Sequence, residues 1–242
     1  MMNIGLFSLS SCSGCLVEFT NLEETILTLL EHFDVKEAQI LKTGTFDGRF
    51  AISFIEGSPT TEHQVEDLLS IRERSDYIVA MGTCACWGGV QTMIEDITMK
   101  TAIERQYHGT PPVISMPPRG IDHYVNVDFK LYGCPFEQSE LVELVRDVLM
   151  NRIYTDKHHS VCKECILREN GCLLEAGEPC LGPVTRGGCN ARCPTSGMYC
   201  TGCRGEYEDM NMHSHYQKLR ELGYTDDQIY RFYNKYYRRW KV

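Results

Sequence analysis

Short apolar runs alternate with longer amphipathic stretches over the first part of the chain. The apolar runs have the length and continuous hydrophobicity of buried strands, whereas apolar residues recur every three or four positions in the stretches between them. The expected strands are residues 3–9, 35–41, 50–55, 77–81 and 127–132. The expected helices are residues 16–33, 62–74 and 138–151. This alternation predicts an α/β fold, with a doubly wound parallel sheet covered by helices on both faces.

The pattern changes after residue 152. A polar stretch follows the last amphipathic segment, and eight of the 13 cysteines then fall between Cys162 and Cys203. Glycines are frequent in this segment, so we expect an irregular chain that needs another source of order, which metal clusters can supply. We therefore predict a flavodoxin-like domain at residues 1–152 and a Cys-rich domain with C-terminal helices at residues 153–242.

The end of the chain regains helical spacing from His213 onward. The segment Thr225-Asp226-Asp227-Gln228 is typical of a capping box that opens a last helix. Four apolar or aromatic positions follow at helical spacing, namely Ile229, Phe232, Tyr233 and Tyr236. Such a stripe predicts packing within the core or against another subunit.

Charge and cysteine content narrow the choice of partners and compartment. The formal net charge of −9 argues against binding to nucleic acid or to an anionic membrane. No apolar run approaches the roughly 20 residues that span a bilayer, and the first residues do not resemble an export signal. We therefore expect a cytoplasmic protein, whose 13 cysteines ligate metal instead of forming disulfides.

Four cysteines of the first region follow predicted strands. Cys12 and Cys15 come after the first strand, Cys84 after the strand ending at Met81, and Cys134 after the last strand. Because the carboxyl ends of parallel strands meet at one edge of the sheet, these thiols are expected to converge. Four thiolates there suit a 4Fe-4S cluster. A structural zinc ion is the alternative, although zinc ligands are more often paired closely in sequence.

Eight cysteines of the second region divide in chain order into two groups of four. The first group is Cys162, Cys165, Cys172 and Cys180, and the second is Cys189, Cys193, Cys200 and Cys203. Two more 4Fe-4S clusters are expected, with spacings unlike those of bacterial ferredoxins. His159 is an alternative ligand three residues before the first group. Cys86, in contrast, is expected to be a small buried apolar residue and not a fifth ligand of the first site.

Several short motifs resemble those of a known family. They are Ser11-Cys12-Ser13-Gly14-Cys15, Phe54-Ile55-Glu56-Gly57-Ser58, Gly82-Thr83-Cys84-Ala85 with Gly88-Gly89, and Tyr132-Gly133-Cys134-Pro135. Together they resemble the small subunits of cytoplasmic (group 3) nickel-iron hydrogenases. Residues 172–194, with Cys200 and Cys203, are similar to the sulfhydrogenase delta subunit and to the small subunits of methyl-viologen-reducing hydrogenases. The resemblance extends to about Gly205.

The resemblance implies three all-cysteine 4Fe-4S clusters. Cys12, Cys15, Cys84 and Cys134 would hold the proximal cluster, nearest the nickel-iron site of a large subunit. The distal cluster would be held by Cys162, Cys165, Cys172 and Cys180. The medial cluster would be held by Cys189, Cys193, Cys200 and Cys203. Some periplasmic relatives use a distal histidine and a three-iron medial cluster, and this sequence departs from both by supplying cysteine.

Two glutamates are candidates for proton transfer beside the proximal cluster. Glu56 directly follows a predicted strand. Its carboxylate could move protons, form a hydrogen bond across a subunit interface or anchor a loop, and the role of loop anchor is favoured. Glu18 lies three residues after Cys15, whereas many relatives have a glutamate two residues after the corresponding cysteine. No other catalytic residue is expected, since hydrogen chemistry would take place in the large subunit.

The expected function is electron transfer in a hydrogenase, an oxidoreductase acting on hydrogen. The chain would relay electrons between the large subunit and a flavin- or iron-sulfur-containing partner, of the ferredoxin type or linked to heterodisulfide reductase. One rival is the related respiratory-complex subunit that carries a single cluster beside quinone, but that protein lacks a second Cys-rich domain. A non-redox zinc scaffold is the other rival.

Overall fold

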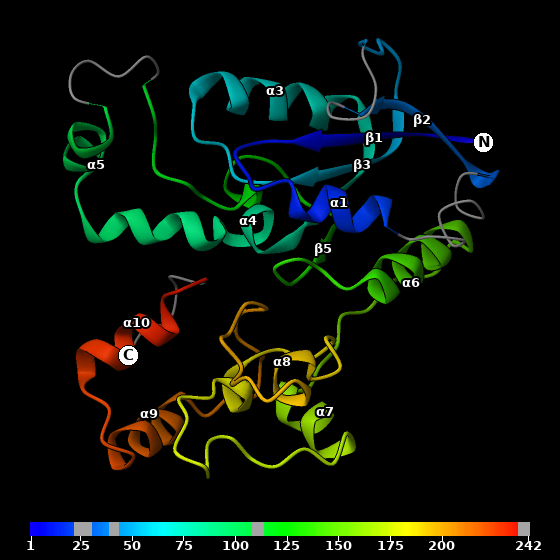
Figure 1. Ribbon diagram of the computed structural model, residues 1–242. Helices are drawn as coiled ribbons and strands as arrows, with labels where there is room; N and C mark the ends of the chain where they lie inside the picture. The colour runs from blue at the N-terminus through cyan, green and yellow to red at the C-terminus, as the bar shows by residue number, and fades with distance from the viewer. Residues whose placement is uncertain (22–30, 39–43, 108–113, 237–242) are drawn as a thin grey trace. The chain divides into compact units, whose positions relative to one another are not determined.

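A parallel sheet organises the first part of the chain (Figure 1). The computed structural model describes residues 1–21, 31–38, 44–107 and 114–236. Within these ranges the strands are β1 (Met2–Ser8), β2 (Phe33–Ala38), β3 (Phe50–Glu56), β4 (Ser75–Met81) and β5 (Phe129–Leu131). They lie in the order β2-β1-β3-β4-β5, and each neighbouring pair is parallel. This is the flavodoxin-like strand order, so the predicted fold is confirmed.

All five predicted strands are present, with small shifts at their ends. The ends of the predicted helices at residues 62–74 and 138–151 are also close to those of α3 (Glu62–Glu73) and α6 (Gln138–Leu149). Residues 39–41, at the end of the second predicted strand, lie outside the described residues.

The helix predicted at residues 16–33 extends one residue too far, because residues 31 and 32 are helical and Phe33 is not. Helix α1 (Gly14–Thr20) is capped by Asn21, and residues 22–30 lie outside the described part of the chain. Phe33 is instead the first residue of β2, where it is buried and pairs with Met2 of β1. Pairing with a neighbouring strand therefore overrides the helical spacing of the sequence at this position.

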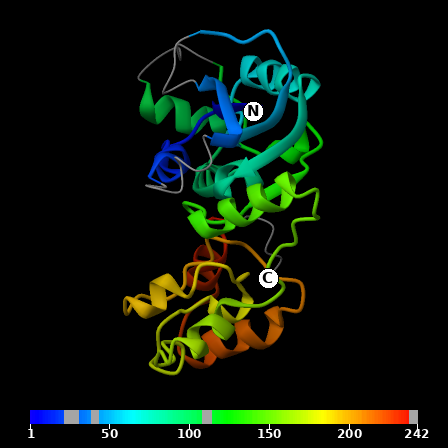
Figure 2. The same ribbon diagram turned by 90° about the vertical axis from the view of Figure 1, so that its right-hand side faces the viewer.

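Helices cover both faces of the sheet. Leu68 and Ile71 of α3 share one core cluster with Ala85 of α4 (Gly82–Trp87) and with strand residues such as Phe7. Phe19 of α1 packs against Phe54 on the other face, with ring centroids 5.3 Å apart. Figure 2 shows α1 and α3 on opposite sides of the strands. The chain between β4 and β5 also forms η1 (Gly89–Asp96), α5 (Met99–Gln106) and η2 (Ile121–His123).

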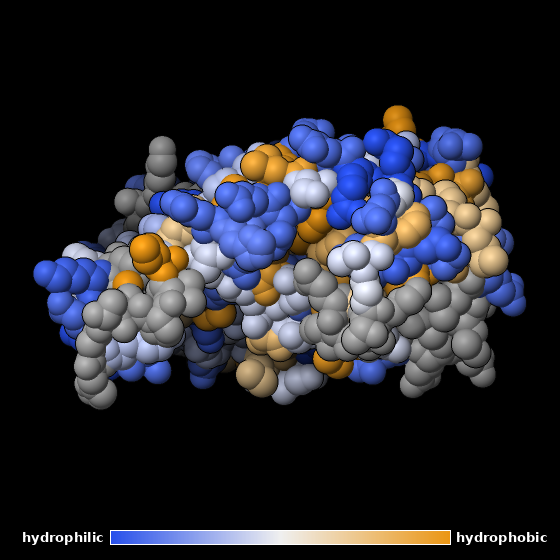
Figure 3. All heavy atoms as spheres, turned by 90° about the horizontal axis from the view of Figure 1, so that it is seen from above, coloured by the Kyte–Doolittle hydropathy of each residue, from blue (hydrophilic) through white to orange (hydrophobic). Residues whose placement is uncertain are grey.

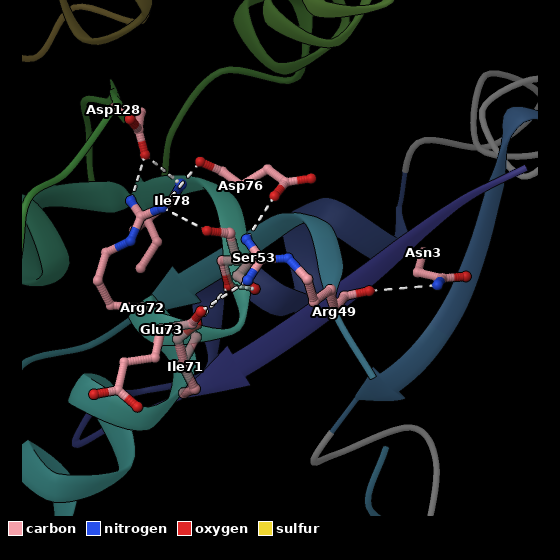
Figure 4. Close-up of polar contacts among 10 residues, drawn as sticks. Asn3, Arg49, Ser53, Ile71, Arg72, Glu73, Asp76, Ile78 and Asp128 are labelled. Atoms are coloured by element: carbon pink, nitrogen blue, oxygen red, sulfur yellow. Dashed lines mark hydrogen bonds and ion pairs between the residues drawn. The ribbon is translucent and has the colours of Figure 1, made fainter. Parts of the chain in front are cut away.

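An arginine network closes the amino end of the strands (Figure 4). Arg72 donates to the Asp128 carboxylate at 2.6 Å and to the carbonyl oxygens of Ser75 and Asp76. Arg49 donates to the Asp76 carboxylate at 2.8 Å. These contacts stabilise the edge of the sheet opposite the cysteines, and they leave the carboxyl ends of the strands available for binding.

Helix α3 presents a mostly polar outer face. Thr61 caps it by accepting a hydrogen bond from the backbone of Gln64, while Leu68 and Ile71 are buried below. Seen from above, this side of the protein is largely hydrophilic with single apolar residues interspersed (Figure 3). Across the described ranges, no helix combines the length and the apolar character that crossing a membrane requires.

The chain divides into two compact units, Met1–Val145 and Arg146–Val242. The domain boundary predicted after residue 152 falls a short way beyond this division. The second unit contains the following helices: α7 (Val161–Leu167), η3 (Gly182–Val184), α8 (Arg192–Thr195), α9 (Met212–Glu221) and α10 (Asp226–Tyr233). The capping box of Thr225 and Gln228 is formed, and Ile229 and Tyr233 of α10 are buried in the unit's core.

Candidate metal centres

Four cysteines of the first unit lie just beyond the carboxyl ends of three strands. Cys12 is in the loop after β1, and Cys15 is in the first turn of α1. Cys84 lies in α4, directly after β4, and Cys134 follows β5. The backbone joins the last two segments, because the Thr83 amide donates to the Gly133 carbonyl at 2.8 Å.

Cys15 is partly buried and lies close to other acidic groups. Burial raises the pKa of its thiol far above the usual range, and the Glu56 charge raises it further. A backbone N–H of Phe136 bonds to the sulfur and works in the opposite direction, whereas Cys84 and Cys134 add to the rise. Desolvation of this kind keeps the thiol protonated unless a positive charge arrives.

Cys84 shares the same environment. Burial raises its pKa to about 11, opposed by a hydrogen bond from the side chain of Gln91. The charges of Cys134, Cys12 and Glu56 raise the pKa as well. The structure therefore brings all four predicted ligands of the first site into one electrostatically coupled group.

Glycines leave room for two of the sulfur atoms. A Cβ added to Gly82, whose φ is +76°, would lie 2.3 Å from Sγ of Cys15. A Cβ at Gly89, whose φ is +65°, would lie 2.6 Å from Sγ of Cys84. Any side chain at either position would thus occupy the space that the thiols take up.

The Glu56 carboxylate holds the first cysteine loop in place. Glu56 is 1% exposed, and its Oε1 accepts hydrogen bonds from the hydroxyls of Ser8 at 2.8 Å and Ser11 at 2.9 Å. Its Oε2 accepts from the backbone amides of Cys15 at 3.1 Å and Leu16 at 3.0 Å. The carboxylate therefore caps the start of α1 and fixes the loop that carries Cys12, which is the geometry of a loop anchor.

Replacing Glu56 with glutamine is expected to destabilise the protein by about 1.5–3 kcal/mol, because an amide nitrogen would face donors that now bond to a carboxylate. Denaturant unfolding measures this change. The matched control is Glu18→Gln, since Glu18 is only partly buried and its backbone carbonyl, not its carboxylate, accepts from Gln138. The control is expected to stay within about 0.5 kcal/mol of the wild type. Equal losses in the two variants would contradict the anchoring role.

Cys86 is buried in the core of the first unit. Its side chain is 0% exposed, and its Sγ lies 3.7 Å from the carbonyl oxygens of both Ala80 and Leu131. It packs in the core between α4 and the sheet.

Cys86→Ala is expected to retain the full iron content and to lose about 1 kcal/mol of stability, the order of one deleted buried group. An iron assay combined with thermal unfolding checks both expectations. A loss of about four irons per chain would instead make Cys86 a ligand.

The first four cysteines of the second unit also form a coupled group. Burial raises the pKa of Cys162 to about 12, and the charges of Cys180, Cys165 and Cys172 add to the rise. A Cβ at Gly182 would lie 3.2 Å from Sγ of Cys162 and 3.5 Å from Sγ of Cys180. Helix α7 supplies the first two of these cysteines, and the loop up to η3 supplies the other two.

The last four cysteines lie in the irregular segment that follows. Cys200 is buried, and its pKa is raised by this burial and then by the charge of Cys203. The two groups adjoin, since the Cys200 amide donates to Sγ of Cys180 at 3.4 Å. Cys193 lies in the short helix α8, and the amide of Arg192 donates to the Cys189 carbonyl.

A buried glutamate that no sequence pattern predicts joins these two groups. Glu164, between Cys162 and Cys165 on α7, accepts from the backbone amides of Gly188 at 2.5 Å and Ala191 at 3.2 Å. His159, proposed above as an alternative ligand, has its Nε2 atom 2.9 Å from Oε1 of the same carboxylate. A charged residue at a helix position carries no sequence signal for such a contact, because the contact depends on how an irregular loop folds back.

The donor sets fit iron-sulfur clusters by their chemistry. Soft thiolates are the ligands of such clusters, and binding must expel protons from thiols with raised pKa values. Glycines at positions 82, 89 and 182 keep the sulfur atoms uncrowded. Among the residues that the structure describes, no three His, Cys, Asp or Glu side chains are grouped closely enough to hold a single metal ion.

Comparison with known proteins gives the family. The model of the family described as NADH ubiquinone oxidoreductase, 20 Kd subunit, matches residues 12–148. The chain belongs to this family. Its relatives include hydrogenase subunits: the sulfhydrogenase 2 subunit delta of Pyrococcus furiosus is 38% identical over 95% of this chain and 97% of its own length. A subunit of the F420-non-reducing hydrogenase vhu of Methanocaldococcus jannaschii is 26% identical over 85% of this chain and 82% of its own length.

This chain is also similar to a chain of known structure. The NAD+-reducing nickel-iron hydrogenase in its H2-reduced state contains a chain that is 25% identical, with a TM-score of 0.56 over 64% of this chain and 94% of that chain. These likenesses confirm the prediction that the chain is a nickel-iron hydrogenase small subunit, a subunit of an oxidoreductase. Small subunits of this kind carry iron-sulfur clusters and transfer electrons, and the catalytic site lies in the large subunit with which they pair.

Proposed function

We propose that this small subunit relays electrons through three 4Fe-4S clusters. The relay runs between the nickel-iron site of the large subunit and a partner that contains flavin or iron-sulfur centres, of the ferredoxin type or linked to heterodisulfide reductase. The first domain, residues 1–152, holds the proximal cluster, and the second, residues 153–242, holds the other two. The ligands are Cys12, Cys15, Cys84 and Cys134 for the proximal cluster, Cys162, Cys165, Cys172 and Cys180 for the distal cluster, and Cys189, Cys193, Cys200 and Cys203 for the medial cluster.

The observation that carries this proposal is the coupling of four thiols at the carboxyl edge of the sheet. Cys12, Cys84 and Cys134 come from segments far apart in sequence that follow β1, β4 and β5, and the charges of Cys12 and Cys134 raise the pKa of Cys84. A bound 4Fe-4S cluster accepts and releases one electron at a time. The chain's own part is to hold the thiolates, to exclude water and to donate backbone N–H groups to sulfur, as the Cys200 amide does to Cys180.

A large-subunit partner is supported by exposure at the first site. Cys12 and Cys134 are exposed in the isolated chain, and Cys15 and Cys84 are partly exposed. A cluster held there would meet water unless another subunit covered it. The proposal also places the complex in the cytoplasm, since a reducing compartment keeps the cysteines of the three ligand sets free of disulfide bonds.

Anaerobic purification of the native complex through a tag on this chain tests the proposal. We expect a nickel-containing large subunit to copurify, together with a flavin- or iron-sulfur-containing subunit that mass spectrometry identifies. The purified complex should also reduce a viologen dye with hydrogen as the electron donor. Recovery of quinone-linked respiratory subunits, or of this chain alone with zinc bound, would contradict the proposal.

A further inference from the structure

A buried arginine lies inside the Cys-rich unit. The Arg204 side chain is 1% exposed and is among the largest fully buried side chains of the described residues. Burying a guanidinium is costly unless acceptors and negative charge lie close to it. The proposed electron relay does not itself require a cation at this position, so the burial of Arg204 needs a separate explanation.

The backbone fixes this arginine over the loop of the last four cysteines. Arg204 directly follows Cys203, and its Nε donates to the Gly187 carbonyl at 2.8 Å. Gly187 lies two residues before Cys189. The two segments also pair along their backbones, because the Arg186 amide donates to the Gly205 carbonyl at 2.9 Å.

Two buried charges of opposite sign lie at the Cys189 loop. Arg204 bonds through its Nε atom to the carbonyl of Gly187, two residues before Cys189. The Glu164 carboxylate has its Oε2 atom 3.9 Å from Sγ of Cys189 and accepts from the amides of Gly188 and Ala191 on either side of it. The Cys189 loop is thus held by one buried cation and one buried anion.

Resting on the proposed function, we infer that Arg204 is a positioning residue that raises the reduction potential of the medial cluster held by Cys189, Cys193, Cys200 and Cys203. One electron enters the cluster from a neighbouring cluster and later leaves to another, so no bond forms and no proton moves. Each reduction adds one negative charge beside Arg204. A fixed cation stabilises the reduced form, and net charge is one of the factors that set cluster potentials. Arginine keeps its charge throughout the accessible pH range, so this contribution does not vary with pH.

A redox titration of the anaerobic complex, followed by electron paramagnetic resonance, tests the inference. In Arg204→Gln, the ratio of reduced to oxidised medial cluster at a fixed potential should fall by about tenfold or more, which corresponds to about 59 mV for a one-electron couple. Arg204→Lys should keep most of the wild-type ratio, since the charge remains. The matched control is Arg220→Gln, because Arg220 is a partly exposed residue of α9 that pairs with Asp226. It should leave the ratio unchanged.

The sign of the shift separates a charge effect from a packing effect. If Arg204 only filled space, its loss would admit water, which stabilises the more negative reduced cluster and raises the potential. An unchanged or raised midpoint in Arg204→Gln, with the medial signal present, therefore overturns the inference and leaves the proposed function intact. Absence of the medial signal from the wild-type complex would overturn the proposed function itself.

If Arg204→Gln does not assemble its medial cluster, a second variant tests whether buried charge beside Cys189 sets the reduction potential. Glu164→Gln removes the negative charge near Cys189 while keeping the shape of the side chain. The midpoint potential of the medial cluster should then rise, because a negative charge destabilises the reduced cluster whereas the positive charge of Arg204 stabilises it. A midpoint potential equal to that of the wild type would show that buried charge beside Cys189 does not set the potential, and it would overturn the inference.

Discussion

Alanine at position 82 is expected to remove about four of the roughly twelve irons that three clusters contain. The added Cβ would lie 2.3 Å from Sγ of Cys15 and 3.3 Å from the Gly133 carbonyl oxygen. Neither neighbour can yield easily, since Glu56 holds the backbone of Cys15 and the Gly133 carbonyl accepts from Thr83. The thiol must therefore leave its position, and the proximal cluster loses a ligand. Iron and acid-labile sulfide per chain, measured on anaerobic protein, report the loss.

The control for this variant is Gly223→Ala. Gly223 also has a positive φ, +91°, but a Cβ there would meet no atom within 4 Å. The control therefore carries the backbone strain, about 1–2 kcal/mol, without the crowding. It should lose stability and keep all its iron. Full iron content in Gly82→Ala would show that the cluster assembles although the Cys15 thiol is displaced, and the assignment of Cys15 to the proximal cluster would be wrong.

Replacing Cys162 with alanine is expected to have an effect of similar size in the second unit. Cys162 is coupled to Cys165, Cys172 and Cys180, so its loss should remove the distal cluster, about four irons, and leave about eight. The electron paramagnetic resonance spectrum of the reduced protein should lose the signal of one cluster and its interactions. A protein that keeps the iron of all three clusters would exclude Cys162 as a required ligand.

Double variants test how the eight cysteines of this unit are divided. Cys180 and Cys200 are close enough for the Cys200 amide to bond to Sγ of Cys180, so an exchange of ligands between the two groups is a real alternative. If the grouping is right, Cys162→Ala combined with Cys180→Ala should lose no more iron than Cys162→Ala alone. Cys162→Ala combined with Cys200→Ala should lose about eight irons. The reverse result would assign Cys180 and Cys200 to each other's groups.

The sheet and the first group of cysteines were predictable because both follow from periodic patterns. The apolar runs around Ile52 and Val79 read as buried strands, and both residues are fully buried in β3 and β4. A cysteine placed just after a parallel strand must lie at the edge where the other strands also end. That rule places Cys12, Cys84 and Cys134 on one edge without knowledge of the tertiary structure.

Other features depend on contacts that no local pattern encodes. Phe33 was predicted to end a helix, but pairing with Met2 makes it the first residue of a strand. Glu164 and Arg204 look in sequence like ordinary charged residues of an irregular segment, yet both are buried beside Cys189. Their burial results from the way the loop around Gly187 folds back on α7 and on the segment after Cys203. No periodic pattern of apolar and polar residues marks such a fold of an irregular loop, so it could not be predicted from the sequence.

Iron and acid-labile sulfide per chain, together with electron paramagnetic resonance of the dithionite-reduced complex, decide whether the chain holds three clusters. We expect about twelve iron and about twelve sulfide per chain, with magnetic interaction between reduced clusters. About four irons per chain would instead favour a single-cluster subunit, and zinc in place of iron would favour a structural scaffold. Either of these two results would contradict a three-cluster relay.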